Sequence, residues 1–348
     1  MALKARQLGI AVLAMLALPA GTSAPAGAGV TRTAYLYDYM PADHLDSLAA
    51  AGFDRALIHA LPDSLDAAGG ARLRLVVDRG LASGVEVVPE WLLQQRSRLA
   101  VRPAARRYTW GRGTVEPSAA CPLDSAYLRS ALLDRAEETL AADGRIRRLA
   151  VDLELLGAGR HHYDAGPCRC ATCVAEYAHG RAELLGGDPT RLSGLLPHEE
   201  ARLARIFGGL LGEFAARHPG VELGVLDLDL TSFVHRALAR ALARSGVPTA
   251  DYTERSYATG ARSLANARAQ LARLGLARAS LHGGLWLKRY SPAALVGAIR
   301  DMRPAADGYF VLTTYSLWQA PARLDGPYLL QAPAAEYWRA LREANATP

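Results

Sequence analysis

The feature of this sequence that most constrains its fold is a regular alternation of short apolar segments with longer amphipathic ones. From Thr33 onwards the chain repeats a strand-like run followed by a helix-like run eight times. Alternation of this kind is typical of βα units in a parallel sheet, and eight such units can close into a barrel. The sequence therefore predicts a single-domain α/β protein with a (β/α)8 TIM-barrel fold.

The expected elements are bounded by turn residues and helix caps. The expected strands cover Thr33–Tyr39, Arg55–Ala60, Val85–Leu92, Arg147–Gly157, Val221–Leu230, Pro248–Tyr257, Ala279–Leu287 and Asp307–Trp318. The expected helices cover Pro41–Ala51, Ser64–Ser83, Asp124–Ala142, Glu199–Arg217, Ser232–Ser245, Arg262–Leu274, Pro292–Met302 and Ala334–Ala344. Two stretches interrupt this series: an irregular, Arg-rich insertion at about 94–120 and a Cys-rich loop at about 157–197.

A doubly wound open sheet is the alternative architecture. Such a sheet normally carries a Gly-rich phosphate-binding turn after its first strand. Here that position holds Tyr37-Asp38-Tyr39-Met40-Pro41, which has no glycine. The closed barrel is therefore favoured.

The N-terminal residues 1–28 have the organisation of a cleaved signal peptide. Lys4 and Arg6 precede an apolar run over Leu8–Ala20, and small residues follow at Ala24 and Ala28. The apolar run is too short to span a bilayer comfortably. We expect an exported protein, periplasmic or secreted, with no membrane span and with residues 29–348 forming the barrel domain.

Charge and motifs exclude several function classes. The formal net charge of +6 falls to +4 without Lys4 and Arg6, and the excess is spread along the chain. No dense basic block of the kind that binds nucleic acid is present. The chain has no H-E-x-x-H spacing and no G-x-S-x-G elbow, so we expect neither a catalytic metal nor a cofactor. The sequence does not determine the oligomeric state.

Two acids near the end of the fourth expected strand are the strongest functional signal. Asp152 and Glu154 are two residues apart, so on a strand they point to the same face. Carboxylates on an apolar strand are costly to bury without a purpose or a partner. A salt-bridged pair is one interpretation, and acid/base or nucleophilic carboxylate chemistry is the favoured one.

Other polar and aromatic residues follow the remaining strands, and a barrel gathers such strand ends into one site. Glu254 is the preferred second catalytic carboxylate and Asp229 the reserve. The candidate substrate-binding residues are Tyr37, Asp38, His59, Glu90, Trp91, Tyr252, His282, Trp286, Lys288, Tyr315 and Trp318.

An acidic site ringed by Tyr and Trp suits sugar chemistry, because aromatic rings stack on sugar faces and two carboxyl groups cleave a glycosidic bond. The sequence therefore predicts a glycoside hydrolase acting on an oligo- or polysaccharide. Two alternatives stay open. One is a non-catalytic carbohydrate-binding or envelope polysaccharide protein. The other is a Schiff-base lyase or aldolase that uses Lys288, the only lysine after the signal peptide.

The four cysteines, Cys121, Cys168, Cys170 and Cys173, allow two structural interpretations. An even number in an exported chain favours disulfides. A four-thiolate zinc site is the competing interpretation, since C-x-C-x-x-C and a distant cysteine can complete a tetrahedron. In both cases the loop after the Asp152 strand would be attached to the segment before the preceding helix.

Residues 121–178 resemble a family of exported bacterial glycoside hydrolases with a TIM-barrel fold. The resemblance rests on Cys121-Pro122 with Tyr127, a strand ending in Asp152, and the C-x-C-x-x-C loop at Cys168–Cys173. It implies that Asp152 is the nucleophile or principal carboxylate. The Asp-Gly that usually precedes this strand is replaced by Arg147-Arg148.

A shorter resemblance concerns Asp152-Leu153-Glu154, which is similar to the D-x-E ending of the chitinase-type fourth strand. That similarity implies that Glu154 is the acid. Both assignments stay open.

Overall fold

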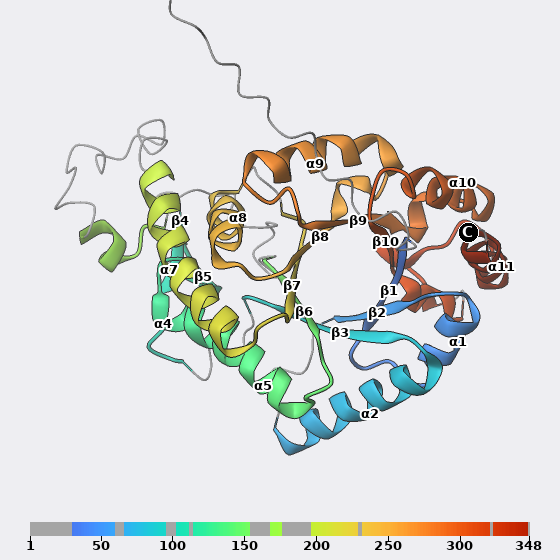
Figure 1. Cartoon of the computed structure of the whole chain (residues 1–348), viewed down its shortest axis with the longest axis horizontal. Helices are drawn as coiled ribbons and strands as arrows, with labels where there is room; N and C mark the ends of the chain where they lie inside the picture. Colours follow the sequence, from blue (N-terminus) through green and yellow to red (C-terminus); the bar gives the residue numbers. More distant parts are fainter. Residues whose placement is uncertain are drawn as a thin grey trace, which may run out of the picture.

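A closed barrel of eight parallel strands forms the centre of the molecule, with helices around it (Figure 1). The computed structural model describes residues 30–59, 66–94, 102–110, 114–153, 168–175, 196–228, 232–320 and 323–346. The expected signal peptide, Glu154 and Asp229 lie outside these residues. The strand order around the barrel is β1-β10-β9-β8-β7-β6-β3-β2, and the predicted (β/α)8 fold is confirmed.

The barrel strands match the predicted ones to within a few residues. They are β1 (Thr31–Tyr37), β2 (Arg55–His59), β3 (Glu86–Leu92), β6 (Arg148–Asp152), β7 (Glu222–Leu226), β8 (Thr249–Thr253), β9 (Ser280–Trp286) and β10 (Gly308–Leu312). Every barrel pairing is parallel. For example, Thr31 of β1 lies beside Gly308 of β10, and Arg55 of β2 lies beside Glu86 of β3. The predicted strands Pro248–Tyr257 and Asp307–Trp318 were too long, because 3-10 turns at Glu254–Ser256 and Thr314–Leu317 replace their last residues.

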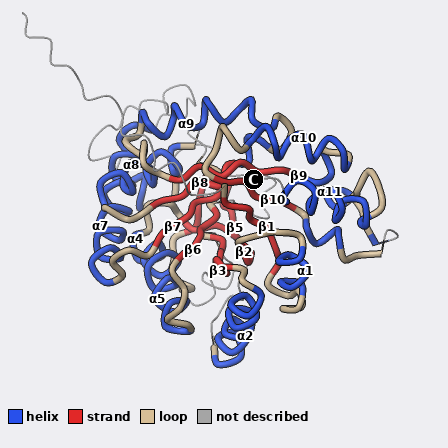
Figure 2. Tube along the Cα trace, turned by 45° about the vertical axis from the view of Figure 1, so that its right-hand side comes forward, coloured by secondary structure: helices blue, strands red, loops and turns tan. Residues whose placement is uncertain are grey.

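Helices cover the outside of the barrel, as the tube view shows (Figure 2). They are α1 (His44–Ala50), α2 (Ala67–Ser83), α4 (Ser125–Leu128), α5 (Arg135–Ala142), α7 (Leu196–Arg217), α8 (Phe233–Ser245), α9 (Leu264–Arg273), α10 (Pro292–Met302) and α11 (Ala334–Ala346). Short 3-10 turns follow several strands, at Glu254–Ser256, Gly260–Ser263, Leu287–Arg289, Thr314–Leu317 and Gly326–Tyr328.

Local sequence explains where several helices begin and end. The Asp66 carboxylate caps α2 by accepting from the Gly69 amide at 2.8 Å. Gly84 and Gly246 end α2 and α8 with φ of 75° and 76°, a left-handed conformation that favours glycine. Ser291 caps α10, and Pro292 occupies its first turn.

The single helix expected over 124–142 is interrupted by a π-helical stretch, η1 (Arg129–Asp134), between α4 and α5. Ala131 within η1 accepts a 2.8 Å hydrogen bond from the indole of Trp91 on β3. The wider π-helical turn leaves a backbone carbonyl free of the usual i→i−4 hydrogen bond, so it can accept from a side chain. The hydrophobic periodicity of the sequence does not predict such a turn. This bond ties the helix to the strand that carries Glu90.

The insertion expected to be irregular contains an antiparallel hairpin. Its strands are β4 (Arg107–Trp110) and β5 (Thr114–Ala120), and they pair with a register shift between Arg107 and Tyr108. Gln94, just after β3, accepts a 2.8 Å hydrogen bond from the Ala120 amide through its side chain. The hairpin is therefore attached to the end of β3.

Two apolar layers stabilise the barrel. The inner layer consists of Tyr35, Leu57, Val88, Ala150, Leu226, Ala250, Tyr252 and Phe310. Small residues on some strands accommodate aromatic rings from others: a Cβ at Gly224 would lie 2.6 Å from the Tyr252 ring. The outer layer lies between strands and helices and includes Trp91, Tyr127 and Phe207. Since side chains alternate along a strand, membership of the inner layer shows which residues point into the barrel.

Candidate functional site

Inward-pointing polar residues gather at the C-terminal ends of neighbouring strands. His59 ends β2 two residues after inner-layer Leu57, and Glu90 lies two residues after inner-layer Val88 on β3. Asp152 ends β6 two residues after inner-layer Ala150. Because β2, β3 and β6 are adjacent in the barrel, the three side chains converge.

These residues and Tyr35 form what we call the His59 group. His59 Nδ1 contacts both Glu90 Oε2 and the Tyr35 hydroxyl. Ligand-type atoms of His59, Glu90 and Asp152 all lie within 4.8 Å of one another. Glu90 is fully buried, and among the described residues its Oε1 has no hydrogen-bond partner. A fully buried carboxylate next to a second carboxylate is an arrangement that needs a functional explanation.

A second set, the Glu254 group, consists of Asp227, Glu254 and Tyr257 after β7 and β8. The Tyr257 hydroxyl donates to Glu254 Oε1 at 3.0 Å. Asp227 Oδ1 accepts from the Thr253 hydroxyl and from the Glu254 amide, both at 3.3 Å. Asp227 adopts a φ of 46°, which is uncommon outside glycine and is held here by these contacts.

Electrostatics show that the two groups share one environment. Burial raises the pKa of Tyr257 well above its ordinary value, and the charges of Glu254, Asp152 and Asp227 raise it further. Burial likewise raises the pKa of Tyr35 well above its ordinary value, helped by Glu90 and Asp152. Asp152 acts on both phenols, and its strand β6 lies between β3, which carries Glu90, and β7, which Asp227 follows.

Aromatic side chains form a rim beside these acids. The Tyr37 and Tyr39 rings stack with centroids 5.4 Å apart, and the Tyr37 and Tyr328 hydroxyls are 3.1 Å apart. Tyr315 packs edge-on against both Tyr37 and Tyr328. Tyr39 is 60% exposed, so this rim presents ring surface to solvent. Flat apolar faces next to carboxylates suit a sugar ligand.

Trp286 is the last residue of β9 and Lys288 follows it, and both contact the segment that leads into Tyr328 of the rim. The Trp286 indole donates to the Pro327 carbonyl at 3.0 Å and its ring is 6.2 Å from that of Tyr257. Lys288 Nζ donates to the Gly326 carbonyl at 2.6 Å and lies 5.7 Å from the Trp286 ring. The lysine is therefore held at the rim by a backbone carbonyl, outside the buried acids.

Four of the predicted substrate-binding residues lie elsewhere, and we do not retain them in the site. Trp91 points outward from β3 and is fully buried against η1. Trp318 stacks on His44 at 4.1 Å and packs against Trp338 of α11. Trp91 lies on β3 as predicted, whereas Trp318 follows the 3-10 turn after β10, and each side chain turns toward the helices.

Tyr252 and His282 point into the barrel at a deeper level. The Tyr252 hydroxyl accepts from Arg55, the first residue of β2, at 3.1 Å. His282 stacks on Tyr252 at 4.7 Å, and burial lowers its pKa to about 3, so it is neutral. These two residues fill the inner layer rather than face a ligand.

Asp38 is half-buried beside the His59 group. Its amide donates to the His59 carbonyl at 3.0 Å, and its own carbonyl accepts from Arg72 of α2.

Asp251, by contrast, points outward from β8 and accepts from the Leu228 amide at 3.1 Å. Burial raises the pKa of Asp251 to about 7.

Sequence reasoning missed Tyr35 and Tyr257 as members of the site. Tyr35 has a readable signal, because it is two residues before Tyr37 on the same strand face. Tyr257 has none, since it follows Glu254 in a 3-10 turn whose direction depends on packing against Gly284 and Phe310. Asp227 was recognisable only as an acid after the fifth strand.

The expected disulfides are not formed: all four cysteines are free in the structure. Their sulfur atoms nevertheless lie together, within 4.8 Å of one another. In the described part of the chain, we find no helix with the length and apolar character needed to cross a membrane.

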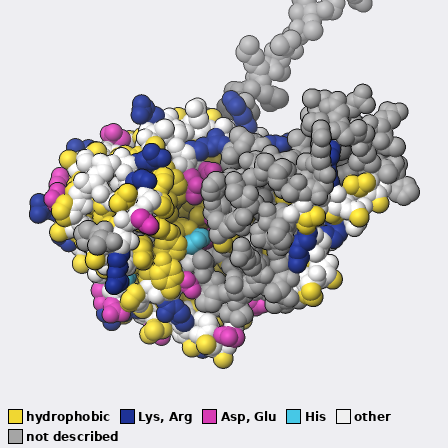
Figure 3. Space-filling model, turned by 180° about the vertical axis from the view of Figure 1, so that it is seen from behind, with side chains coloured by type: hydrophobic (Ala, Val, Ile, Leu, Met, Phe, Trp, Pro, Cys, Tyr) yellow, Lys and Arg dark blue, Asp and Glu magenta, His cyan; other side chains and the backbone are white. Residues whose placement is uncertain are grey.

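The face opposite to the view of Figure 1 carries hydrophobic side chains next to acidic ones and a histidine (Figure 3).

No family model and no curated protein matches this chain. Solved structures that resemble this chain include glycoside hydrolases. Their TM-scores are below 0.5, so the resemblance concerns the fold alone. Enzymes of other classes that share the barrel match as well, among them an aldolase.

Three glycoside hydrolases illustrate this likeness. α-L-fucosidase isoenzyme 2 from Paenibacillus thiaminolyticus shares 10% identity at a TM-score of 0.48 over 91% of this chain, which spans only 49% of that enzyme. The endo-β-N-acetylglucosaminidase from Cordyceps militaris shares 11% identity at 0.47, over 92% of each chain. A mutant O-GlcNAc hydrolase from Thermobaculum terrenum shares 6% identity at 0.44, over 91% of this chain and 63% of that one.

Proposed function

We propose that this protein is a glycoside hydrolase acting on an oligo- or polysaccharide at the C-terminal end of its barrel. The observation that carries the proposal is the position of Asp152 at the end of β6, between β3 with Glu90 and β7, which Asp227 follows. Carboxylates from β3, β6 and the segments after β7 and β8 thereby surround a single region bordered by tyrosines.

The chemistry requires one carboxyl group to protonate the glycosidic oxygen and a second to act on the anomeric carbon or on a water molecule. Asp152 is the principal carboxylate in this proposal, with the buried Glu90 and His59 fixing its surroundings. Glu254 is the general acid, positioned by the hydroxyl of Tyr257. Its proton goes to the leaving oxygen as the bond to the anomeric carbon breaks.

Substrate binding is assigned to the aromatic rim. Tyr37, Tyr315 and Trp286 border the acids, and their rings offer the flat apolar surface on which a sugar face stacks. Glu154 and Asp229 lie outside the described residues and remain proposals from the sequence: Glu154 as an alternative acid and Asp229 as the reserve carboxylate.

A screen of chromogenic glycosides and bacterial exopolysaccharides tests the proposal. Wild-type protein should release product from at least one of them, and Asp152→Asn and Glu254→Gln should each abolish release without a large change in Tm. Asp301→Asn, an exposed change on α10, is the matched control. Full turnover in both site variants would refute the assignment. Sugar binding by calorimetry with no product after long incubation would instead identify a non-catalytic binding protein.

One observation favours a second candidate, a metal-assisted hydrolase. The imidazole of His59 and the carboxylates of Glu90 and Asp152 have ligand atoms within 4.8 Å of one another, and such N/O sets bind divalent cations. Activity that is lost on dialysis against a chelator and restored by one cation would support it. Chelator-resistant activity would leave the two-carboxylate mechanism.

For Lys288, the bond to the Gly326 carbonyl at the rim gives no support to a Schiff-base role.

We also propose export, on the signal-peptide pattern of residues 1–28. Expression in a bacterial host should give a mature chain that begins near Pro25 or Gly29 and is found in the periplasm or the medium. N-terminal sequencing of the fractionated protein checks this. An intact Met1 in the cytosolic fraction would contradict it.

A further inference from the structure

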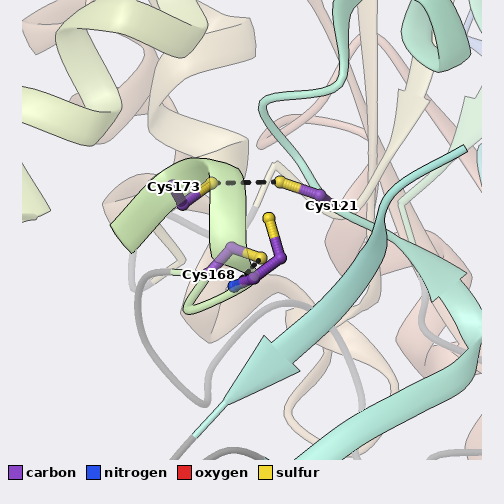
Figure 4. Close-up of side chains that lie close together, drawn as sticks. Cys121, Cys168 and Cys173 are labelled. Atoms are coloured by element: carbon purple, nitrogen blue, oxygen red, sulfur yellow. Dashed lines mark hydrogen bonds between the residues drawn. The ribbon is translucent and has the colours of Figure 1, made fainter. Parts of the chain in front are cut away.

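All four cysteines of the chain meet beside the β4–β5 hairpin. Cys121 directly follows β5, and the other three belong to the segment 168–175, which ends in a helical turn. The sulfur atoms lie within 4.8 Å of one another, and those of Cys121 and Cys173 are 3.4 Å apart. Figure 4 shows the side chains of Cys121, Cys168 and Cys173 converging from these two segments.

The spacing of the sulfurs fits one shared ion better than disulfides. A disulfide joins two sulfurs at about 2.05 Å, and the Cys121–Cys173 pair is well beyond that distance. In a tetrahedral zinc site with bonds of about 2.3 Å, the sulfurs are about 3.8 Å apart. Four sulfurs that are all mutual neighbours can surround one ion, whereas two disulfides would need two separate pairs.

Hydrogen-bond donors point at the sulfurs. The amides of Thr109 and Cys170 each donate to Cys168 Sγ at 3.5 Å. The Leu123 amide donates to Cys121 Sγ at 3.4 Å, and the guanidinium of Arg106 donates to Cys173 Sγ at 3.8 Å. Donors of this kind stabilise sulfur that carries negative charge, and they are a regular second layer around metal thiolates.

Burial makes a cation necessary for that charge. Cys121, Cys168 and Cys173 are fully buried, and uncompensated thiolates are costly there. Cys170 is half-buried, so the cluster is not wholly enclosed.

We propose that Cys121, Cys168, Cys170 and Cys173 bind one zinc ion in a four-thiolate structural site. The ion would hold the segment that returns from the Asp152 strand against the hairpin, where the Arg169 amide already donates to the Thr109 carbonyl at 2.6 Å. The hairpin in turn is bonded to Gln94 after β3. The site thus supports both strands that carry the acids Glu90 and Asp152, whatever reaction they perform.

Metal and thiol analysis of the full chain, purified without tag or reductant, tests this directly. We expect one zinc per chain and four titratable thiols after denaturation with chelator. Replacing zinc by Co²⁺ should give the intense near-ultraviolet sulfur-to-metal absorption of a tetrahedral thiolate site. A metal-free protein with fewer than four free thiols would overturn the proposal in favour of disulfides. A metal-free protein with four thiols that does not bind added Zn²⁺ would overturn it as well.

Variants separate specific from adventitious binding. Cys170→Ser changes the one half-buried ligand and should abolish the Co²⁺ absorption and reduce the bound zinc to a small fraction. Thr172→Ala, an exposed change in the same segment, should keep both. Chelation should lower the Tm of the wild type and of Thr172→Ala by several degrees, but not that of Cys170→Ser. Equal metal binding by all three proteins would refute the site.

Discussion

Glu90 on β3 and Asp152 at the end of β6 point into the barrel with carboxylate oxygens within 4.8 Å of each other. Two negative charges at this distance repel strongly away from water, so a proton or a cationic partner must accompany them. His59 is placed to serve, because its Nδ1 contacts Glu90 directly. The close acids and the imidazole therefore behave as one unit.

This unit predicts a coupling between His59 and Glu90. His59→Ala leaves the fully buried Glu90 without its partner and should destabilise the protein by about 3 kcal/mol. In His59→Ala/Glu90→Gln the buried acid is neutral, and the double variant should lose at least about 1 kcal/mol less than the sum of the single changes. Urea unfolding of the four proteins gives the coupling. Simple additivity would show that the contact has no energetic role.

The Tyr257 hydroxyl is predicted to matter for the reaction. Tyr257→Phe removes the donor that stabilises the negative charge Glu254 acquires as it gives up its proton. Because a hydrogen bond to a charged group contributes about 1.5–3 kcal/mol, kcat should fall about tenfold or more. Tyr290→Phe is the control, because that hydroxyl donates only to the Ser256 carbonyl. Steady-state kinetics on the substrate found in the screen would decide. Equal rates for both variants would remove Tyr257 from the site.

Gly284 provides the space for the Tyr257 ring. A Cβ at Gly284 would lie 2.4 Å from that ring and 2.7 Å from Phe310, so Gly284→Ala should displace the tyrosine. We expect a loss of about 1–3 kcal/mol in unfolding free energy and reduced activity. A Cβ at Gly297 in α10 would meet no heavy atom within 4 Å beyond its own stretch of helix. Gly297→Ala should therefore stabilise the protein by about 0.5–1 kcal/mol. Thermal denaturation of both variants checks the contrast.

Asp251 predicts a specific pH dependence of stability. Burial raises its pKa from 3.8 to about 7, so the folded protein holds a proton that the unfolded chain releases. The associated stability is complete below about pH 4 and is lost as the pH rises to about 7, a change on the order of 4 kcal/mol. Asp251→Asn keeps an oxygen that can accept from Leu228. The difference in unfolding free energy between wild type and variant should therefore shift in favour of the variant over this range, and a constant difference would contradict the raised pKa.

Much of the architecture could be predicted because it depends on local pattern. The apolar strands, the Asp66 cap, the Gly84 and Gly246 helix ends and Pro292 at the start of α10 are all decided by nearby residues. The position of Asp152 at a strand end follows from the same pattern. The direction of each side chain was harder to predict, because an error of one residue in the strand register turns a side chain from the barrel interior to the helices. Trp91 illustrates this beside the inward-pointing Glu90.

The sequence by itself therefore determined eight βα units, their order, and which strands end in acids and aromatic residues, since period and capping are local properties. The tertiary structure decided which of these side chains meet. It placed His59 against Glu90, turned Tyr257 toward Glu254, sent Trp318 to α11, and brought Cys121 to the sulfurs of 168–173. All of these contacts except Tyr257 with Glu254 join different structural elements, so their geometry depends on barrel closure and packing rather than on any local pattern. The Tyr257 ring is local to its 3-10 turn, but its direction depends on packing against Gly284 and Phe310.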